Sequence, residues 1–139
     1  MKFYTIDPDV PGRTHGETIR AFRSGHHPEN VRYIFECWPE ADVVQTFPIF
    51  LVSEKLALAL RSAKLTGFEL KACESSKGDQ FHIASPGYGE LPKYFWLDVN
   101  GKSEQDDFGI SNDLMLRISE RVYDLLQNFC VEGAEIDPV

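Results

Sequence analysis

Two stretches of the chain carry apolar side chains at positions i, i+3, i+4 and i+7, the spacing that lines one face of a helix. The first series is Leu56, Ala59, Leu60 and Ala63, and the second is Val122, Leu125, Leu126 and Phe129. Ser53 and Ser119 precede these series and can cap a helix by accepting a hydrogen bond from an unpaired backbone N–H. We therefore expect two amphipathic helices of about three turns each.

The two helical stretches belong to a longer internal repeat, because residues 51–71 align without a gap to residues 117–137. In each copy a glycine, Gly67 or Gly133, follows the helix and permits a turn. Alternating apolar residues then indicate a strand. The pattern could also arise twice independently, since Ser-Glu before an amphipathic helix is common. Two copies are too few for a solenoid, so we expect two equivalent helix–strand units within one domain.

Aromatic and β-branched runs predict further strands at residues 2–6, 31–38, 43–52, 80–84 and 93–99. We expect a hairpin-type connection at residues 74–79 and a tight hairpin turn at Asn100–Gly101.

The polar residues 13–30 are poorly periodic, and we expect a long surface loop there with one helical turn near residues 18–22. Together these elements amount to about seven strands and two or three helices. The expected fold is α+β, in a single domain that covers residues 1–139 with a mostly antiparallel sheet.

A chain of 139 residues can bury a core without disulfides or metal ions. Its three cysteines, Cys37, Cys73 and Cys130, are widely spaced among apolar residues, which favours reduced, partly buried thiols. No apolar stretch is long enough to span a membrane, and the N-terminus lacks an apolar secretory core. The cytoplasm is therefore the expected compartment.

The formal net charge of −8 is the compositional feature with functional content. It argues against nucleic acid and membranes as partners, because phosphates and anionic lipids would be repelled. It is compatible with a basic protein partner, although the same charge can serve solubility alone.

Motifs of common enzymes are missing from the sequence. Neither a Walker loop nor G-x-G-x-x-G nor G-x-S-x-G occurs. His15, His26 and His27 share one loop and are the best candidates for metal ligands, but zinc sites usually show ligand pairs at short spacing on both sides. We expect no catalytic residue, no cofactor and no metal site.

Turn-rich segments supply candidates for partner binding. Tyr88 lies between two glycines, Trp38 ends a strand, and the acidic segment before residue 108 is expected to be exposed. Aromatic anchors and carboxylates of this kind can form one face that attracts a cationic partner, although they are also compatible with ordinary surface and a partly buried Trp. The predicted partner-binding residues are Trp38, Tyr88, Glu104, Asp106, Asp107 and Asp113.

The two ends of the chain carry short motifs that support a family resemblance. The opening holds Phe3-Tyr4 and Asp9-Val10-Pro11-Gly12, and the close holds Asp107-Phe108, Ile118-Ser119-Glu120-Arg121, Leu125-Leu126, Gly133-Ala134-Glu135-Ile136 and Pro138-Val139. These motifs resemble the immunity proteins of bacterial polymorphic toxin systems, the Myxococcus-type immunity domain family. Residues 13–106 depart from that pattern, and His15-Gly16 stands where a Trp or Leu-Gly is expected.

The resemblance implies a single cytoplasmic domain that binds and blocks a cognate toxin, with no catalytic residues to transfer. We therefore predict a non-enzymatic protein that neutralises a toxin effector, as a monomer or a homodimer, and a basic toxin would suit its acidity. One alternative is a small enzyme or metal-binding protein that uses the loop of His15, His26 and His27. Another is a structural adaptor that self-associates through an exposed sheet edge.

Overall fold

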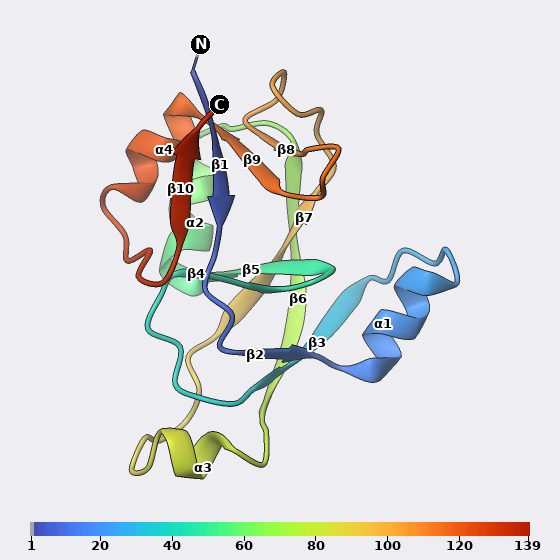
Figure 1. Cartoon of the computed structure of the whole chain (residues 1–139), viewed down its shortest axis with the longest axis vertical. Coiled ribbons are helices and arrows are strands. Elements are labelled where there is room, and N and C mark those ends of the chain that lie inside the picture. The colour runs from blue at the N-terminus through green and yellow to red at the C-terminus, as the bar shows by residue number, and fades with distance from the viewer. Residues whose placement is uncertain (1) are drawn as a thin grey trace.

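The computed structural model describes residues 2–139, so Met1 of the predicted domain 1–139 lies outside the described residues. Ten strands and four helices form within this range (Figure 1). The strands are β1 (Phe3–Asp7), β2 (Gly12–Thr14), β3 (Asn30–Phe35), β4 (Val43–Thr46), β5 (Ile49–Ser53), β6 (Phe68–Lys77), β7 (Tyr94–Val99), β8 (Phe108–Ile110), β9 (Leu116–Ser119) and β10 (Glu135–Pro138). The helices are α1 (Gly16–Arg23), α2 (Glu54–Ser62), α3 (Phe81–Ala84) and α4 (Glu120–Leu126).

The strands form two sheets. Sheet A has the strand order β10-β1-β9-β8, and sheet B has the order β2-β3-β6-β7-β5-β4. Within residues 2–139, neighbouring strands are antiparallel except β3 and β6. The predicted α+β class with mostly antiparallel pairing is confirmed. The predicted hairpin at Asn100–Gly101 is wrong, because β7 pairs with β5 and β6 and the chain then crosses to sheet A.

Both sequence repeats fold into the same succession of strand, helix and strand, namely β5-α2-β6 and β9-α4-β10. Ser53 and Ser119 cap the two helices, and each Oγ accepts a hydrogen bond of 3.3 Å from the backbone N–H of Leu56 or Val122. The predicted Ser-capped units are confirmed. The helices are shorter than expected, with 9 residues in α2 and 7 in α4.

Gly67 and Gly133 turn the chain from each helix into the following strand. Their φ angles are 93° and 81°, in the left-handed region that is strained for a residue with a Cβ. A Cβ at Gly67 would lie 2.3 Å from the backbone oxygen of Phe108, and one at Gly133 would lie 2.7 Å from the Asp9 side chain. Both conformation and packing therefore require glycine at these positions.

Each sheet contains one strand from the other half of the chain. β1 opens the N-terminal half but lies in sheet A between β9 and β10, whereas β7 opens the C-terminal half but lies in sheet B between β5 and β6. The registers correspond, because Ile6 faces Ile136 and Leu97 faces Leu70, where Leu70 and Ile136 are equivalent repeat positions. The order β10-β1-β9-β8 thus matches β6-β7-β5-β4, and the two halves have exchanged their first strands.

The central core draws on equivalent positions of both halves. Leu56 and Leu60 of α2 meet Val122 and Leu126 of α4, and each of these side chains is nearly or fully buried. Burying one such aliphatic side chain contributes about 1.5–3 kcal/mol. The buried members are Ile6, Val43, Val52, Leu56, Ala57, Leu60, Leu97, Phe108, Leu116, Ile118, Val122 and Leu126. The predicted leucine and valine positions of both helix faces therefore lie in the core between the halves, whereas Ala59 and Ala63 do not belong to it.

Sheet B has a second core on its opposite face. Leu51 of β5 packs into this second core while its neighbour Val52 packs into the central one, as strand alternation requires. The N-terminal half carries β2, α1 and β3 as an insertion between β1 and β4. The strands β2 and β3 cover the second core. The Tyr33 hydroxyl on β3 donates a hydrogen bond to the backbone oxygen of Gln45 on β4 at 2.9 Å.

The prediction of a long loop over residues 13–30 is wrong, because β2 and the 8-residue helix α1 occupy part of it, although α1 contains the helical turn expected near residues 18–22. His15 caps α1, its Nδ1 accepting a hydrogen bond of 3.1 Å from the N–H of Glu17. Thr18 Oγ1 accepts another from the N–H of Arg32 on β3, also at 3.1 Å. So short a helix leaves little periodic signal, and contact with β3 stabilises it instead.

The prediction of a strand at residues 80–84 is also wrong. α3 forms there, and Phe81 is fully buried in the second core. β6 continues to Lys77 through most of the expected connection, because β3 pairs with its residues 72–77 in parallel. Within the described residues, no helix combines the length and the apolar character needed to cross a membrane.

Candidate functional site

Asp107 is buried where the two halves meet, with 6% of its surface exposed. Its Oδ1 accepts a hydrogen bond of 2.6 Å from Ser119 Oγ, and its Oδ2 accepts bonds from the N–H of Thr66 at 2.9 Å and from Arg121 Nη2 at 2.8 Å. Thr66 follows the helix of the first repeat, whereas Ser119 and Arg121 belong to the second. The expectation that Asp107 is exposed is wrong, because its buried carboxylate ties the halves together.

The hydrogen bonds around Asp107 keep it ionised. Burial alone would raise the pKa of this carboxyl, because a charged group loses its hydration. Bonds from Arg121, Ser119 and the backbone of Thr66 outweigh burial and lower the pKa of Asp107 to about 2. The pKa of Arg121 is raised in turn by its hydrogen bond to Asp107. Asp107 is therefore a structural anion at neutral pH and not a proton donor.

Asp42 takes the equivalent place in the other half. Its Oδ1 accepts from Ser53 Oγ at 2.7 Å, and its Oδ2 accepts from the N–H of Cys130, in the loop after α4, at 2.8 Å. Lys55 stands where the second repeat has Arg121, with Nζ 3.7 Å from Asp42 Oδ2. We name the two groups the Asp42 clasp (Asp42, Ser53, Lys55 and the N–H of Cys130) and the Asp107 clasp (Asp107, Ser119, Arg121 and the N–H of Thr66).

Trp38 and Tyr88, both predicted to bind a partner, lie together. Their rings stack with centroids 4.6 Å apart and an interplanar angle of 19°. The N–H of Trp38 donates to Ser85 Oγ at 2.9 Å, which fixes the segment after β3 to the turn after α3. Tyr88 is 47% exposed, so the pair offers an accessible aromatic surface.

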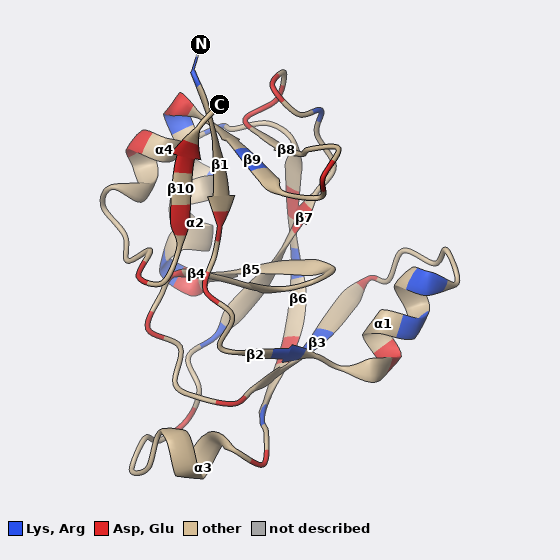
Figure 2. Ribbon diagram, in the orientation of Figure 1, with Lys and Arg blue, Asp and Glu red and all other residues tan. Residues whose placement is uncertain are grey.

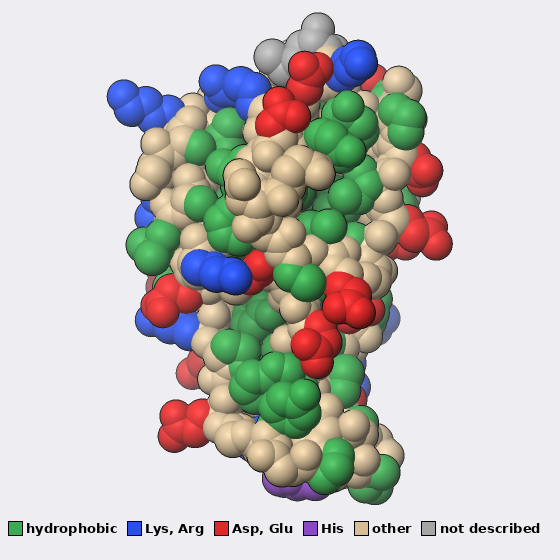
Figure 3. Space-filling view, turned by 90° about the vertical axis from the view of Figure 1, so that its left-hand side faces the viewer, with side chains coloured by type: hydrophobic (Ala, Val, Ile, Leu, Met, Phe, Trp, Pro, Cys, Tyr) green, Lys and Arg blue, Asp and Glu red, His purple; other side chains and the backbone are tan. Residues whose placement is uncertain are grey.

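Two grooves flank residues 90–94 beside this aromatic pair. Their volumes are about 490 and 450 Å³, and Pro92, Lys93 and Tyr94 line both. Figure 3 views the left-hand side of the molecule, where hydrophobic side chains gather in the lower half with acidic ones at their border. The grooves contain lysines as well as carboxylates, so this end has no clear preference for the charge of a partner.

The outer face of sheet A carries carboxylates. Ile6 of β1 and Ile136 of β10 pack into the central core, so the residues that alternate with them point away from it. Those residues include Asp7, Glu135 and Asp137, and all three are exposed. Figure 2 shows the acidic positions on β10 and at the end of β1. We name Asp7, Glu135 and Asp137 the acidic face.

Within residues 2–139, the carboxylates of the acidic face have no cation at ion-pairing distance. Asp7 lies directly opposite Glu135 in the antiparallel pair of β1 and β10. Like charges directly opposite each other destabilise a sheet. Within residues 2–139, none of the three takes part in an ion pair, and Asp7 accepts only a neutral hydrogen bond from Gln45 Nε2.

Glu104 and Asp113, also predicted to bind a partner, line one polar pocket of about 390 Å³. Glu104 Oε2 lies 3.3 Å from Nη1 of Arg117, which lines the same pocket. Asp113 accepts a hydrogen bond from Ser111 Oγ, which lowers the pKa of this exposed carboxyl. Asp106 is partly exposed, and its Oδ2 accepts from the N–H of Lys102 at 2.7 Å to close a turn.

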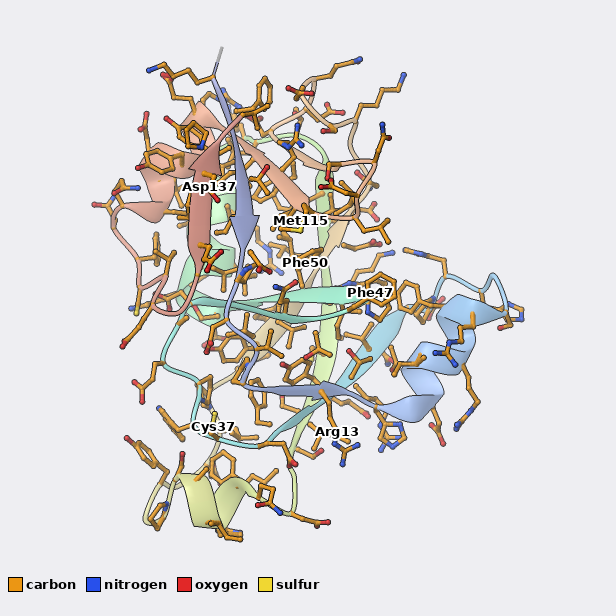
Figure 4. The ribbon with its side chains drawn as sticks, in the orientation of Figure 1. Arg13, Cys37, Phe47, Phe50, Met115 and Asp137 are labelled. Atoms are coloured by element: carbon orange, nitrogen blue, oxygen red, sulfur yellow. The ribbon has the colours of Figure 1, made fainter. Side chains whose placement is uncertain are left out.

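The predicted recognition residues therefore occupy two ends of the molecule. The loops before β8 and between β8 and β9 lie at the end that holds the termini, while α3 and the turn after it lie at the other (Figure 1). Figure 4 places Asp137 on β10 in the upper part, and Cys37, the neighbour of Trp38, in the lower part near α3. The expectation that aromatic and acidic residues form one face is wrong.

The three histidines of the predicted loop do not converge. His15 caps the start of α1 and His27 follows its end, and a helix of this length spans about 12 Å. Within residues 2–139, no three side chains of His, Cys, Asp or Glu are arranged to hold a metal ion. The alternative of a small enzyme or metal-binding protein that uses this loop therefore needs a site around His27 alone.

His27 belongs to a cluster that sequence reasoning missed. Asp98 on β7 is 6% exposed, and its Oδ2 lies 2.6 Å from His27 Nε2 and 2.8 Å from Lys71 Nζ. The hydrogen bond with Asp98 raises the pKa of Lys71. The His27 ring also lies 5.3 Å from the ring of Trp96. In the sequence, Asp98 itself indicates this cluster, because a carboxylate on the inward side of an apolar strand needs hydrogen-bond or ion-pair partners.

All three cysteines are free thiols. Cys37 and Cys73 are partly buried as predicted, but Cys130 is exposed, which corrects the expectation for that residue. Burial raises the pKa of Cys73 to about 11 and is also the main reason that the pKa of Cys37 is raised. Neither thiol is activated as a nucleophile by its surroundings.

Comparisons of the chain with protein-family models, with curated proteins and with solved structures gave no match. The resemblance to immunity proteins therefore stays a prediction, and function has to be inferred from the surfaces themselves.

Proposed function

We propose that this protein is a non-enzymatic, cytoplasmic immunity protein that binds and neutralises a toxin effector through the acidic face of sheet A. The observation that carries the proposal is the cross-strand pair of Asp7 and Glu135, two exposed carboxylates without a cation between them. Their mutual repulsion is unfavourable in the free protein. A partner that places a positive charge between them removes the repulsion, so binding is favoured.

The overall charge supports a basic protein as that partner. At −8, the chain repels phosphates and anionic lipids but attracts a cationic protein surface and speeds its encounter. A nuclease toxin with a basic nucleic-acid-binding site has the required charge. In this proposal the carboxylates capture the toxin, and the rigid sheet behind them blocks its site.

A co-expression experiment tests this function. The tagged protein is captured from its native cells with salt raised in steps, and the recovered partner is then expressed with and without it. We expect one stoichiometric partner that is released by salt, that stops growth when expressed alone, and that is harmless when the protein is present.

A charge-matched pair of variants locates the interface. The triple variant Asp7→Asn, Glu135→Gln, Asp137→Asn should lose capture and protection. The control Glu29→Gln, Asp79→Asn, Asp124→Asn removes the same charge from exposed positions elsewhere and should retain both. Protection by the first triple variant at the level of the control would disprove the role of the acidic face.

A second candidate function is an enzymatic or metal-binding role for His27, favoured by its contact with the buried Asp98 and Lys71. In that case the purified protein should carry a stoichiometric metal ion or an activity that a His27→Ala variant loses. A metal-free protein whose His27→Ala variant still protects cells would exclude it.

Self-association through the free edge of β10 is disfavoured by the backbone. The N–H of Val139 donates to the oxygen of Phe3 at 2.9 Å, so by alternation the N–H groups of Glu135 and Asp137 also face β1. Pro138 has no N–H. Within β10, only Ile136 directs an N–H outward, which is too little for a strand to add. Light scattering should find no dimer that depends on this edge.

A further inference from the structure

The strand β6 has a neighbouring strand on both sides over only part of its length. Its residues 72–77 pair with β3, whereas its pairing with β7 ends at Ala72 and Phe95. Beyond that point lies the groove of about 490 Å³, with the end of β6 on one side and residues 90–94 on the other. Figure 1 shows these two segments separating towards α3. We name residues 73–77 the open edge of β6.

Pro92 explains why the pairing stops. If the antiparallel register of β6 and β7 continued, Pro92 would lie opposite Ser75. The oxygen of Lys93 accepts a hydrogen bond of 3.1 Å from the N–H of Glu54, so by alternation residue 92 is the one that faces β6. A proline has no N–H to donate to Ser75. The ladder therefore stops, and the segment before β7 leaves the open edge without a partner strand.

The open edge directs main-chain groups into the groove. The N–H of Gly78 donates to the oxygen of Phe35 on β3 at 2.8 Å, so by alternation Ser75 and Lys77 direct their N–H and C=O groups to the other side. Within residues 2–139, no backbone group pairs with them there. Both residues line the groove, so these groups can be reached from it. A row of unpaired N–H and C=O groups is a template for another strand.

The inner wall of the groove is apolar. Cys73 and Leu91 pack against the second core, to which Tyr94 belongs, and all three line the groove. Side chains of a strand alternate between its two faces, so every second residue of an added strand would contact this wall and the others would face solvent. A segment of alternating apolar and polar residues therefore suits the groove.

The charge of this groove differs from that of the whole molecule. The two grooves beside residues 90–94 are mixed in charge when taken together, but the lining of this one holds Lys77 and Lys93 against Glu90. Neither lysine takes part in an ion pair within the described chain. A carboxylate on an added segment therefore meets cations here, although the protein as a whole carries a charge of −8.

We infer that an extended, acidic segment of a partner protein adds to the open edge as a further strand. The N–H and C=O groups of Ser75 and Lys77 hold its main chain, and Lys77 and Lys93 attract its carboxylate. The open edge is about 13 Å long, enough for about five residues. Residues 90–94 wall the groove opposite β6, so a single extended segment fits, whereas the edge of a folded sheet does not. This surface is separate from the acidic face, and the inference does not depend on the proposed function.

Amide hydrogen exchange tests the open edge in the free protein. Ser75 and Lys77 should exchange rapidly, whereas Glu74 and Ser76, whose N–H groups face β3, should be protected. Slow exchange at Ser75 and Lys77 would overturn the inference. Protection there that rises with protein concentration would show that a second copy fills the edge, and would overturn it as well.

A peptide probe tests the occupant. Acetyl-Thr-Val-Glu-Val-Thr-amide, added to ¹⁵N-labelled protein, should cause saturable shifts confined to residues 73–77 and 90–94, with a Kd in the millimolar range. Replacement of its glutamate by glutamine should weaken binding about threefold. A peptide with proline in place of both valines keeps the charge but cannot form a ladder, and it should cause no saturable shift. Diffuse shifts, or equal binding of the proline peptide, would disprove strand addition.

Two variants of one residue separate the main chain from the side chain. Ser75→Pro removes an N–H from the open edge without removing a bond to β3, and it should weaken binding of the valine peptide about tenfold. Ser75→Ala keeps that N–H and should bind like the wild type. Equal binding by the two variants would contradict the inference. If Ser75→Pro does not fold, the comparison of the valine and proline peptides on the wild type still decides.

Discussion

The Asp42 clasp and the Asp107 clasp hold equivalent joints with different cations. Arg121 contacts both oxygens of Asp107, through Nε at 3.2 Å and Nη2 at 2.8 Å. Lys55 approaches a single oxygen of Asp42 at 3.7 Å. A guanidinium that binds a carboxylate through two N–H groups fixes its orientation, whereas an ammonium acts as a point charge. The same scaffold is therefore held more firmly in one half than in the other.

The difference follows from what surrounds each half. Sheet B is supported by a second core under β2 and β3, whereas the described residues form no second core on the outer face of sheet A. Sheet A therefore depends on the Asp107 clasp more than sheet B depends on the Asp42 clasp. The uncovered face is also the one that carries the acidic residues, so the half with the weaker apolar support presents the proposed binding surface.

Removal of either clasp carboxylate should lower the free energy of unfolding more than the other changes below, and the two losses should differ. Asp107→Ala should lower the free energy of unfolding by about 3 kcal/mol, because buried donors lose a charged acceptor, and Asp42→Ala by about 2 kcal/mol. Urea unfolding measures both. Asp106→Ala, which loses one turn hydrogen bond, is the control and should cost less than either. Equal losses for the two clasp variants would contradict the comparison.

Acid should weaken the Asp107 clasp at a defined pH. The pKa of Asp107 falls from 3.8 to about 2 on folding, so the ionised form stabilises the folded state above pH 4. This contribution, about 2 kcal/mol, is lost as pH falls from 4 towards 2. Unfolding measured from pH 6 to pH 2 should show that loss as a difference between wild type and Asp107→Asn. Parallel curves for the two proteins would refute this role.

The two turn glycines should also differ. Gly67→Ala places a Cβ against the backbone oxygen of Phe108, which cannot move away easily, and should cost about 2 kcal/mol. Gly133→Ala meets the side chain of Asp9, whose carboxylate can rotate away although its Cβ, 2.9 Å from the added methyl, cannot, and should cost about 1 kcal/mol. Thermal unfolding of both variants checks the order, with Gly25→Ala, where φ is positive but space is open, as the control for backbone strain alone.

Exchange of the cations should have the smallest effect. Arg121→Lys should cost about 0.5 kcal/mol, and Lys55→Arg should change stability by less, since both side chains are more than half exposed. A double-mutant cycle with each Asp→Asn variant measures the coupling. Stronger coupling of Lys55 to Asp42 than of Arg121 to Asp107 would contradict the proposal that the Asp107 clasp is the firmer one.

The sequence predicts local features of the fold well where a residue acts on its own neighbours. Ser53 and Ser119 cap helices, Gly67 and Gly133 turn the chain, and the repeat marks equivalent units. These features depend on residues a few positions apart, which is the range of caps and turns. Pairing of β1 with β9 and β10 joins opposite ends of the chain and leaves no periodic signal.

The candidate site was predictable only in part for the same reason. Tyr88 and Trp38 stand out by residue type and indeed stack. Asp107 looks like the acidic residues next to it, and only Thr66, Ser119 and Arg121 in space make it structural. Asp7 and Glu135 are unremarkable in sequence and become a pair only through strand register.

Strand exchange also constrains the order in which the chain can fold as it is synthesised. β1 leaves the ribosome more than a hundred residues before both of its neighbours, β9 and β10. Sheet A can therefore form only after β9 and β10 have been synthesised, as expected for contacts of high sequence separation. Until then, Tyr4 and Ile6 have no sheet to join, and a nascent chain arrested before residue 116 exposes them to chaperones or to aggregation.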